Sequence, residues 1–183
     1  MKTALVFKSI ATHALLVWST VVFSHAALDQ PAALAGTGYT AALRIGHGCQ
    51  GSPTTAVKVF IPAGFRGAKP QTKPGWTLAT RVDKLAKPDD SHGRTITEDV
   101  TEITWTAASK DSWLPDAHYD EFTLRGTLPE QDGAMWFRVL QTCEKGAWDW
   151  AEVPASGTST KGLKSPAVLL DILPGGRAGG HQH

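Results

Sequence analysis

The sequence predicts an all-β protein with the architecture of a β-sandwich. No window of helical length among its 183 residues shows a convincing 3.6-residue period of apolar side chains. Short segments in which polar and apolar residues alternate recur instead, and turns rich in glycine and proline separate them. Many short strands between such turns are typical of two antiparallel sheets packed on each other.

The expected strands are bounded by glycine, proline or polar stretches. In the first of them, 39–45, Leu43 and Ile45 recur at a period of two and so share one face. Segment 84–94 is polar and contains Pro88, which favours an exposed loop. The other expected strands cover 56–61, 76–82, 95–100, 102–106, 119–125, 135–141 and 148–153, and a brief apolar run covers 167–173.

The first residues predict a secretory signal, because lysines precede an apolar run at 14–23 and small residues follow it. Cleavage after Ser24 makes His25 the first residue of the mature chain. Cleavage after Ala26 satisfies the small-residue rule about as well. We expect a signal peptide at 1–24, one domain at 25–173 and a flexible tail containing glycine and histidine at 174–183.

Charge and hydropathy argue for a soluble, exported protein. Lys and Arg number 18 against 17 Asp and Glu, so the formal net charge is +1 and no basic block stands out. Nucleic acid and anionic membrane surfaces are therefore not expected as main partners. No stretch after the signal is long and apolar enough to span a bilayer, so we expect no integral membrane segment in the mature chain.

The chain has two cysteines, Cys49 and Cys143. In an exported protein the default expectation is one disulfide between them. The alternative reading makes them soft copper ligands. An oxidising compartment pairs two free thiols readily, which favours the disulfide.

A histidine at the mature N-terminus is a chelating group in its own right, because the α-amine and imidazole Nδ1 of His25 reach one metal ion. No H-E-x-x-H, C-x-x-C, G-x-S-x-G or P-loop motif occurs, so zinc-hydrolase, thioredoxin, serine-hydrolase and nucleotide chemistry have no support. Of the other histidines, His13 leaves with the signal, His181 and His183 lie on the tail, and His47, His92 and His118 fall in or beside loops.

Two further groups of residues attract attention. Asp120 and Glu121 are adjacent on an expected strand, so their carboxylates point to opposite faces. Trp148 and Trp150 flank Asp149, so the two indoles share one face. Paired tryptophans are found in cores, and they also form platforms for a sugar or a peptide.

Segment 43–54, which reads LRIGHGCQGSPT, is similar to the signature of the YcnI/DUF1775 family of exported proteins encoded beside copper-handling genes. Segments 73–76 (KPGW), 119–122 (YDEF) and 150–154 (WAEVP) resemble later landmarks of that family in the same order. The resemblance extends from His25 to about residue 167, which is nearly the whole mature chain.

This resemblance implies an immunoglobulin- or fibronectin-III-like β-sandwich that holds copper(II) in a single-histidine brace, close to a carboxylate and a tryptophan. On this chain the histidine is His25 and the tryptophan is Trp150. Glu121 is the first choice for the carboxylate and Asp120 is the second. Asp29 is a poorer candidate, since it lies only four residues from the mature N-terminus.

The resulting expectation is a periplasmic or secreted copper(II)-binding protein, a metallochaperone in copper trafficking and not an enzyme, with copper-handling proteins of the envelope as partners. A copper oxidase or monooxygenase is the first alternative, and it needs a second histidine from His47, His92 or His118. A metal-free interaction module with Trp148 and Trp150 as its platform is the second alternative. That reading gains support if cleavage follows Ala26.

Overall fold

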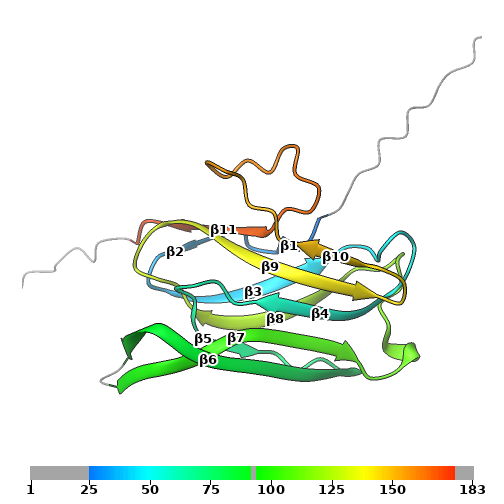
Figure 1. The fold of residues 1–183 in the computed structure, drawn as a ribbon, viewed down its shortest axis with the longest axis horizontal. Coiled ribbons are helices and arrows are strands. Elements are labelled where there is room, and N and C mark those ends of the chain that lie inside the picture. The colour runs from blue at the N-terminus through cyan, green and yellow to red at the C-terminus, as the bar shows by residue number, and fades with distance from the viewer. Residues whose placement is uncertain (1–24, 92–93, 176–183) are drawn as a thin grey trace, which may run out of the picture.

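The computed structural model describes residues 25–91 and 94–175, which form two β-sheets packed face to face (Figure 1). The predicted signal peptide, His92 and the tail histidines lie outside the described residues. The smaller sheet has the order β1 (Ala27–Leu28), β3 (Gly38–Ile45), β8 (Asp120–Thr127) and β5 (Arg66–Pro70). The larger sheet has the order β2 (Ala32–Leu34), β11 (Val168–Leu173), β9 (Gly133–Cys143), β4 (Thr54–Phe60), β7 (Arg94–Ala107) and β6 (Trp76–Ser91), and β10 (Ala147–Trp150) pairs with β9.

The all-β sandwich predicted from the sequence is confirmed. Along β3 the side chains of Tyr39, Ala41, Leu43 and Ile45 are buried, as the period-two pattern predicts. Helical structure in the described residues is limited to the short 3-10 turn η1 (Lys110–Ser112), and no helix there is long and apolar enough to cross a bilayer.

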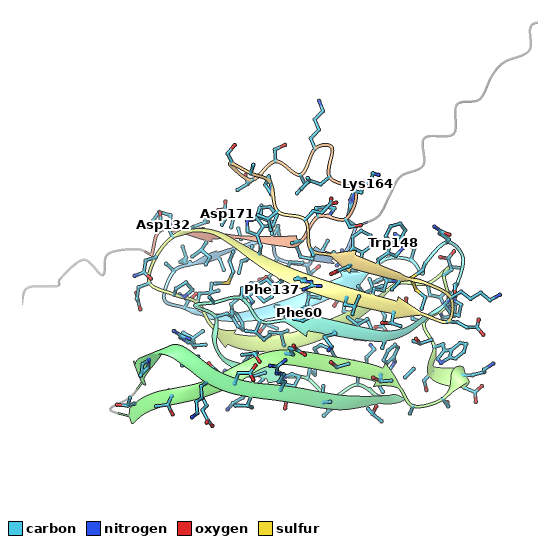
Figure 2. All side chains as sticks on the ribbon, in the orientation of Figure 1. Phe60, Asp132, Phe137, Trp148, Lys164 and Asp171 are labelled. Carbon is cyan, nitrogen blue, oxygen red and sulfur yellow. A yellow bond between two sulfur atoms is a disulfide. The ribbon has the colours of Figure 1, made fainter. Side chains whose placement is uncertain are left out.

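Aromatic side chains join the two sheets in the core. Phe122 of β8 meets Trp76 of β6 and Trp105 of β7 edge-on, with ring centroids 5.0 and 5.8 Å apart respectively. Trp105 is fully buried, and its indole N–H donates to the carbonyl oxygen of Gln71 at 2.9 Å. The core therefore buries large apolar area without leaving that indole N–H unsatisfied. Figure 2 shows Phe137, a fully buried core residue, on β9.

Strand β9 organises the larger sheet, because β4 pairs with one of its edges while β11 and β10 share the other. Phe137 of β9 pairs with Val168 of β11, and Val139 pairs with Trp150 of β10. The chain thus leaves this edge at Trp150 and returns to it at Val168. Backbone hydrogen bonds close the base of the intervening loop, including Ala167 N to Glu152 O at 2.8 Å. This loop projects from the sandwich (Figure 1).

The N-terminal end of the described chain is held against β3. Ala27 pairs with Arg44, and Asp29 N donates to Ala42 O at 3.0 Å. If this antiparallel register continued past β1, it would place His25 opposite Gly46. The first described residue therefore lies near the end of β3, where the glycine-rich segment begins.

The predicted loop at 84–94 is wrong, because β6 continues to Ser91 and forms a long hairpin with β7 (Figure 1). Pro88 is tolerated because β6 is the edge strand of its sheet and the register shifts between Lys84 and Asp89. The two strands predicted at 95–100 and 102–106 are one strand, β7. Sequence reasoning also missed β1, β2 and β5, which have two, three and five residues and are too short to show a period.

The predicted disulfide between Cys49 and Cys143 is confirmed, with a Cα–Cα distance of 5.9 Å. It connects the turn after β3 of the smaller sheet to the end of β9 in the larger sheet. The bond therefore ties the two layers together at one end of the sandwich. A disulfide is consistent with export to an oxidising compartment.

Removing this disulfide should lower the free energy of unfolding substantially. The two cysteines are separated by 94 positions, and a closed loop of that size restricts the unfolded chain by about 4 to 5 kcal/mol in the chain-entropy treatment. We expect a Cys49→Ser/Cys143→Ser variant to show a loss approaching that value in urea unfolding. The denatured wild type should contain no free thiol, and two free thiols per chain would contradict the bond.

Candidate metal centre around Trp150

Three aromatic side chains contact Trp150 at the end of the sandwich where the two sheets meet. The His25 and His47 rings both approach it edge-on, with centroids 5.8 and 6.3 Å from the indole and interplanar angles of 82° and 78°. Trp148 stacks on Trp150 with centroids 5.4 Å apart, which confirms that the two indoles share a face. Figure 2 shows Trp148 on β10. Trp150 is only 1% exposed, whereas both histidines are half-buried.

Gln141 of β9 fixes the orientation of Trp150. The indole N–H donates to Gln141 Oε1 at 3.2 Å. The amide nitrogen of Gln141 in turn donates to the carbonyl oxygen of His47 and to Thr54 Oγ1, both at 2.7 Å. Gln141 is 1% exposed, so these bonds form where water does not compete. One buried amide thus holds the indole, the His47 segment and β4 in a fixed arrangement.

The segment that carries His47 is a tight turn between β3 and β4. Cys49 and Ser52 exchange two backbone hydrogen bonds of 2.9 and 3.0 Å around Gln50 and Gly51, whose φ angles are 54° and 85°. A Cβ atom on Gly48 would lie 1.9 Å from the carbonyl oxygen of Ser52, so only glycine fits there.

Two further attachments fix this turn. Gly48 N donates to Asp116 Oδ1 at 2.9 Å, and Cys49 is bonded to Cys143. His47 therefore lies on a rigid support, held by a disulfide, a side-chain carboxylate and the backbone hydrogen bonds of the turn.

The hydrogen bond of His47 determines which of its ring nitrogens is free. Nδ1 lies within hydrogen-bond distance of the carbonyl oxygen of Gly48. A carbonyl oxygen can only accept, so Nδ1 carries the proton in this arrangement. In the neutral imidazole Nε2 then keeps its lone pair, which is the form that binds a metal ion.

The first-choice carboxylate, Glu121, lies on the outer face of the smaller sheet and is already paired. Arg44 of β3 pairs with Glu121 of β8 across the two strands, and Arg44 Nη2 lies 3.1 Å from Glu121 Oε1. The same guanidinium nitrogen binds the carboxylate of Asp29. The hydrogen bonds that Arg44 donates, first to Glu121 and then to Asp29, raise the pKa of Arg44 above its usual value. Arg44 therefore joins two of the three carboxylates considered from the sequence.

The second-choice carboxylate, Asp120, points to the opposite face, as the strand alternation predicts. It forms an ion pair of 2.6 Å with Lys73, whose ammonium lies 5.1 Å from the centre of the Phe122 ring. The structure thus places the two candidate carboxylates in separate ion pairs on opposite faces of β8.

Asp149, between the two tryptophans, also has a partner on the surface. Arg138 binds its carboxylate through two nitrogens, at 2.9 and 2.6 Å. Hydrogen bonding to Arg138 holds the pKa of Asp149 below its usual value. This bidentate pair fastens β10 to β9, and it leaves the opposite face of β10 to the two indoles.

The described residues contain no group of three or more His, Cys, Asp and Glu side chains placed to hold a metal ion. A metal at Trp150 would therefore need a donor that is not one of these side chains. The α-amine that cleavage after Ser24 would create on His25 is such a donor. The imidazole of His25 lies beside Trp150, so the chelating residue named from the sequence and the named tryptophan are in contact.

Sequence reasoning did not identify Gln141 and treated His47 as one loop histidine among several. A signal for both was present, because Gln141 and Cys143 are two residues apart on one strand face. A disulfide from Cys143 to Cys49 necessarily brings this face close to His47. His118, by contrast, is exposed and lines a depression with Trp113 and Tyr119, apart from the contacts described for Trp150.

Replacing Gln141 with leucine should lower the free energy of unfolding by more than about 2 kcal/mol. The Trp150 N–H and the His47 carbonyl would both lose their hydrogen-bond partner. Each buried polar group left unsatisfied costs about 1–3 kcal/mol. Urea unfolding measures the loss. Gln131→Leu is the matched control, since Gln131 is exposed. Equal stability of the two variants would show that the Gln141 amide contributes nothing.

A solved protein with the same architecture is described as "Crystal structure of an uncharacterized protein from Nocardia farcinica reveals an immunoglobulin-like fold". It is 25% identical to this chain, the match covers 81% of this chain and 97% of that one, and the TM-score is 0.61. No curated protein matches the chain. The family model described as "Domain of unknown function (DUF1775)" matches residues 25–172, and the chain therefore belongs to the DUF1775 family.

Proposed function

We propose that this protein is exported, binds one copper(II) ion at His25 and passes it between copper-handling proteins of the envelope, without catalysing a reaction. The observation that carries the proposal is the contact between His25 and the buried indole of Trp150. The family match begins at the same histidine. Periplasmic or secreted location follows from the proposed signal, and the disulfide is consistent with it.

The donor set suits copper(II). Cleavage after Ser24 would give His25 a free amine next to Nδ1, and the two nitrogens would form a chelate from one residue. Nitrogen donors of this borderline type bind divalent copper more strongly than the other first-row divalent metals. The half-buried position of His25 shields one side of the chelate, while the other remains open to a partner protein.

Trp150 acts as a neighbour of the ion and not as a donor in this proposal. An indole presents a negative face that attracts a cation, but it offers no lone pair for coordination. Trp150 cannot rotate freely, because Gln141 holds its N–H and Trp148 stacks on it. A fixed aromatic wall would restrict the ion to one side of His25 and keep its coordination number low. Such a site favours capture and transfer over permanent storage.

Glu121 is the carboxylate that we assign to this site, with Asp120 as second choice. Glu121 would exchange Arg44 for the ion, and Arg44 would still be paired with Asp29. Both pairs are partly exposed, and exposed ion pairs contribute only about 0–1 kcal/mol. The exchange therefore costs little free energy. Asp120 would have to leave Lys73 on the other face of β8, which makes it the weaker candidate.

A copper oxidase or monooxygenase is a second candidate function, and the position of His47 beside Trp150 favours it. Such enzymes use a second histidine on the metal. Ascorbate- and oxygen-dependent turnover of polysaccharide by the copper-loaded protein would support this candidate. Absence of turnover, together with transfer of copper to an acceptor protein, would support trafficking.

A free amine on His25 should be essential for tight copper binding. Loss of groups that merely orient a ligand costs about 10- to 100-fold in metal affinity, so loss of a donor should cost at least that much. We therefore expect a mature protein with one alanine added before His25 to bind copper(II) at least about 100-fold more weakly in competition titrations. Intact mass must first show that the exported protein begins at His25. Equal affinity of the extended and native proteins would refute the chelate.

Copper(II) should quench tryptophan fluorescence mainly through Trp150. We expect Trp150→Phe to remove most of the copper-dependent quenching while lowering affinity only modestly, because the indole supplies no donor atom. Trp113→Phe is the control, since Trp113 packs against Lys110 near η1 and does not take part in the Trp150 contacts. Unchanged quenching in Trp150→Phe would assign the effect to another indole.

A further inference from the structure

We infer that two copies of this protein form a symmetric dimer, in which the free edges of their β6 strands pair antiparallel around Val82. This inference goes beyond the proposed function and does not rest on it. Strand β6 is the last strand of the larger sheet, and among the described strands it pairs with β7 alone (Figure 1). Its other edge therefore presents backbone N–H and C=O groups that have no neighbouring strand.

The free edge of β6 is much longer than the other sheet edges of the described chain. Strand β6 has 16 residues, whereas β1, β5 and β2, which end the sheets elsewhere, have two, five and three. An open edge is a template for pairing with another chain, and natural proteins protect such edges with short strands, prolines and bulges. An edge of this length therefore needs either such protection or a partner.

The protection of β6 begins only after Lys84. The register shift at Arg81 comes from an extra residue on β7, Thr101, so β6 itself stays regular there. The next shift, after Lys84, comes from extra residues on β6, and Pro88 lies among them. The segment 76–84 thus contains no proline and no bulge of its own, and it remains open to a second strand.

The backbone of Val82 faces this open edge. The carbonyl oxygen of Arg81 accepts from Thr101 Oγ1 of β7 at 3.4 Å, so it points toward β7. Successive residues of a strand direct their backbone N–H and C=O groups to opposite edges, so those of Val82 point away from β7. The Val82 side chain is 53% exposed, which is high for a large apolar residue. Pairing with Val82 of a second copy would join these backbone groups and bring the two side chains together.

The charges on either side of Val82 are self-complementary. Arg81 and Asp83 form an ion pair of 3.0 Å on the same strand, and their side chains are 61% and 40% exposed. In an antiparallel pair centred on Val82, Arg81 of each copy lies opposite Asp83 of the other, as two-fold symmetry requires. Opposite charges across a strand pair are favourable and like charges are unfavourable. These two residues therefore specify a register in which the charges attract.

Dimerisation through β6 would leave the candidate metal centre open in both copies. Trp150 lies on β10, which pairs with β9, and β4 and β7 separate β9 from β6. Three strand spacings amount to about 14 Å. The second copy would therefore extend the larger sheet at the side away from Trp150, and each copy could exchange an ion independently.

Sedimentation velocity of the exported protein, from micromolar to submillimolar concentration, tests the inference. A contact between two strands is smaller than a standard stable interface, so we expect a dimer that dissociates on dilution. Val82→Lys places two ammonium groups opposite each other and should weaken dimerisation at least about 10-fold. Val153→Lys is the matched control, because Val153 is 49% exposed but lies outside β6. This control should dimerise like the unchanged protein.

Exchange of charges tests the register. Arg81→Asp alone and Asp83→Arg alone each place like charges opposite each other, so each variant by itself should dimerise at least about 10-fold more weakly. An equimolar mixture of the two variants should form heterodimers, because every aspartate at these positions then lies opposite an arginine. A contact through another surface, or in another register, does not predict this rescue.

A protein that stays monomeric at the highest concentration would overturn the inference. The same conclusion follows if Val82→Lys or Arg81→Asp leaves the dimer unchanged, or if the mixture of charge variants stays monomeric. Near-ultraviolet circular dichroism checks that each variant is folded. If Val82→Lys does not fold, the mixture of charge variants still decides the question.

Discussion

The buried amide of Gln141 is the interaction on which the rest of the candidate centre depends. It accepts from Trp150, which belongs to β10, and donates to the His47 backbone and to Thr54 of β4. These partners come from three separate segments that meet only at the end of the sandwich. Because the amide is shielded from water, losing one partner would leave a polar group unsatisfied at a cost of about 1–3 kcal/mol. The network therefore gives this corner a single arrangement, which a site for one small ion needs.

The disulfide and the chain register extend that constraint to both sheets. Cys143 lies two residues beyond Gln141 and is bonded to Cys49 in the turn that carries His47. The β1–β3 pairing brings His25 to the same corner from the opposite layer. The centre thus lies where segments of both sheets meet, and a disulfide and the Gln141 hydrogen bonds connect those segments. The one proposed donor that the folded side chains do not provide is the α-amine, which proteolysis after Ser24 would create.

The sequence predicted the architecture well because the fold depends on patterns that are local. The alternation of polar and apolar side chains along β3 and β9, together with the turns between strands, indicates two sheets. Two cysteines in an exported chain indicate one disulfide. The shared face of Trp148 and Trp150 and the opposite faces of Asp120 and Glu121 follow from the same period. The full length of the β6–β7 hairpin was missed because β6 is an edge strand. One side of an edge strand has no neighbouring strand to hydrogen-bond, so Pro88 and polar residues are tolerated there. Gln141 and His47 were missed although the expected disulfide indicates that they lie close together. The hydrogen bonds of the Gln141 amide were not predictable, since they depend on the packing of one sheet on the other.

If Glu121 serves as the carboxylate of the proposed site, the ion pairs of Arg44 would let that site bind an ion firmly and still release it. Arg44 holds Glu121 and Asp29 together on the outer face, and all three side chains are partly exposed. If Glu121 moved toward an ion at His25, Asp29 would keep the guanidinium paired, so no charge would be left alone. Breaking a solvent-exposed ion pair of this kind costs only about 0–1 kcal/mol of free energy. The nitrogen donors would then determine affinity, while a mobile carboxylate would lower the cost of coordination changes during transfer to a partner. A fixed nitrogen set beside an exchangeable oxygen ligand is the arrangement that a carrier requires, because tight binding and release make opposite demands on one site.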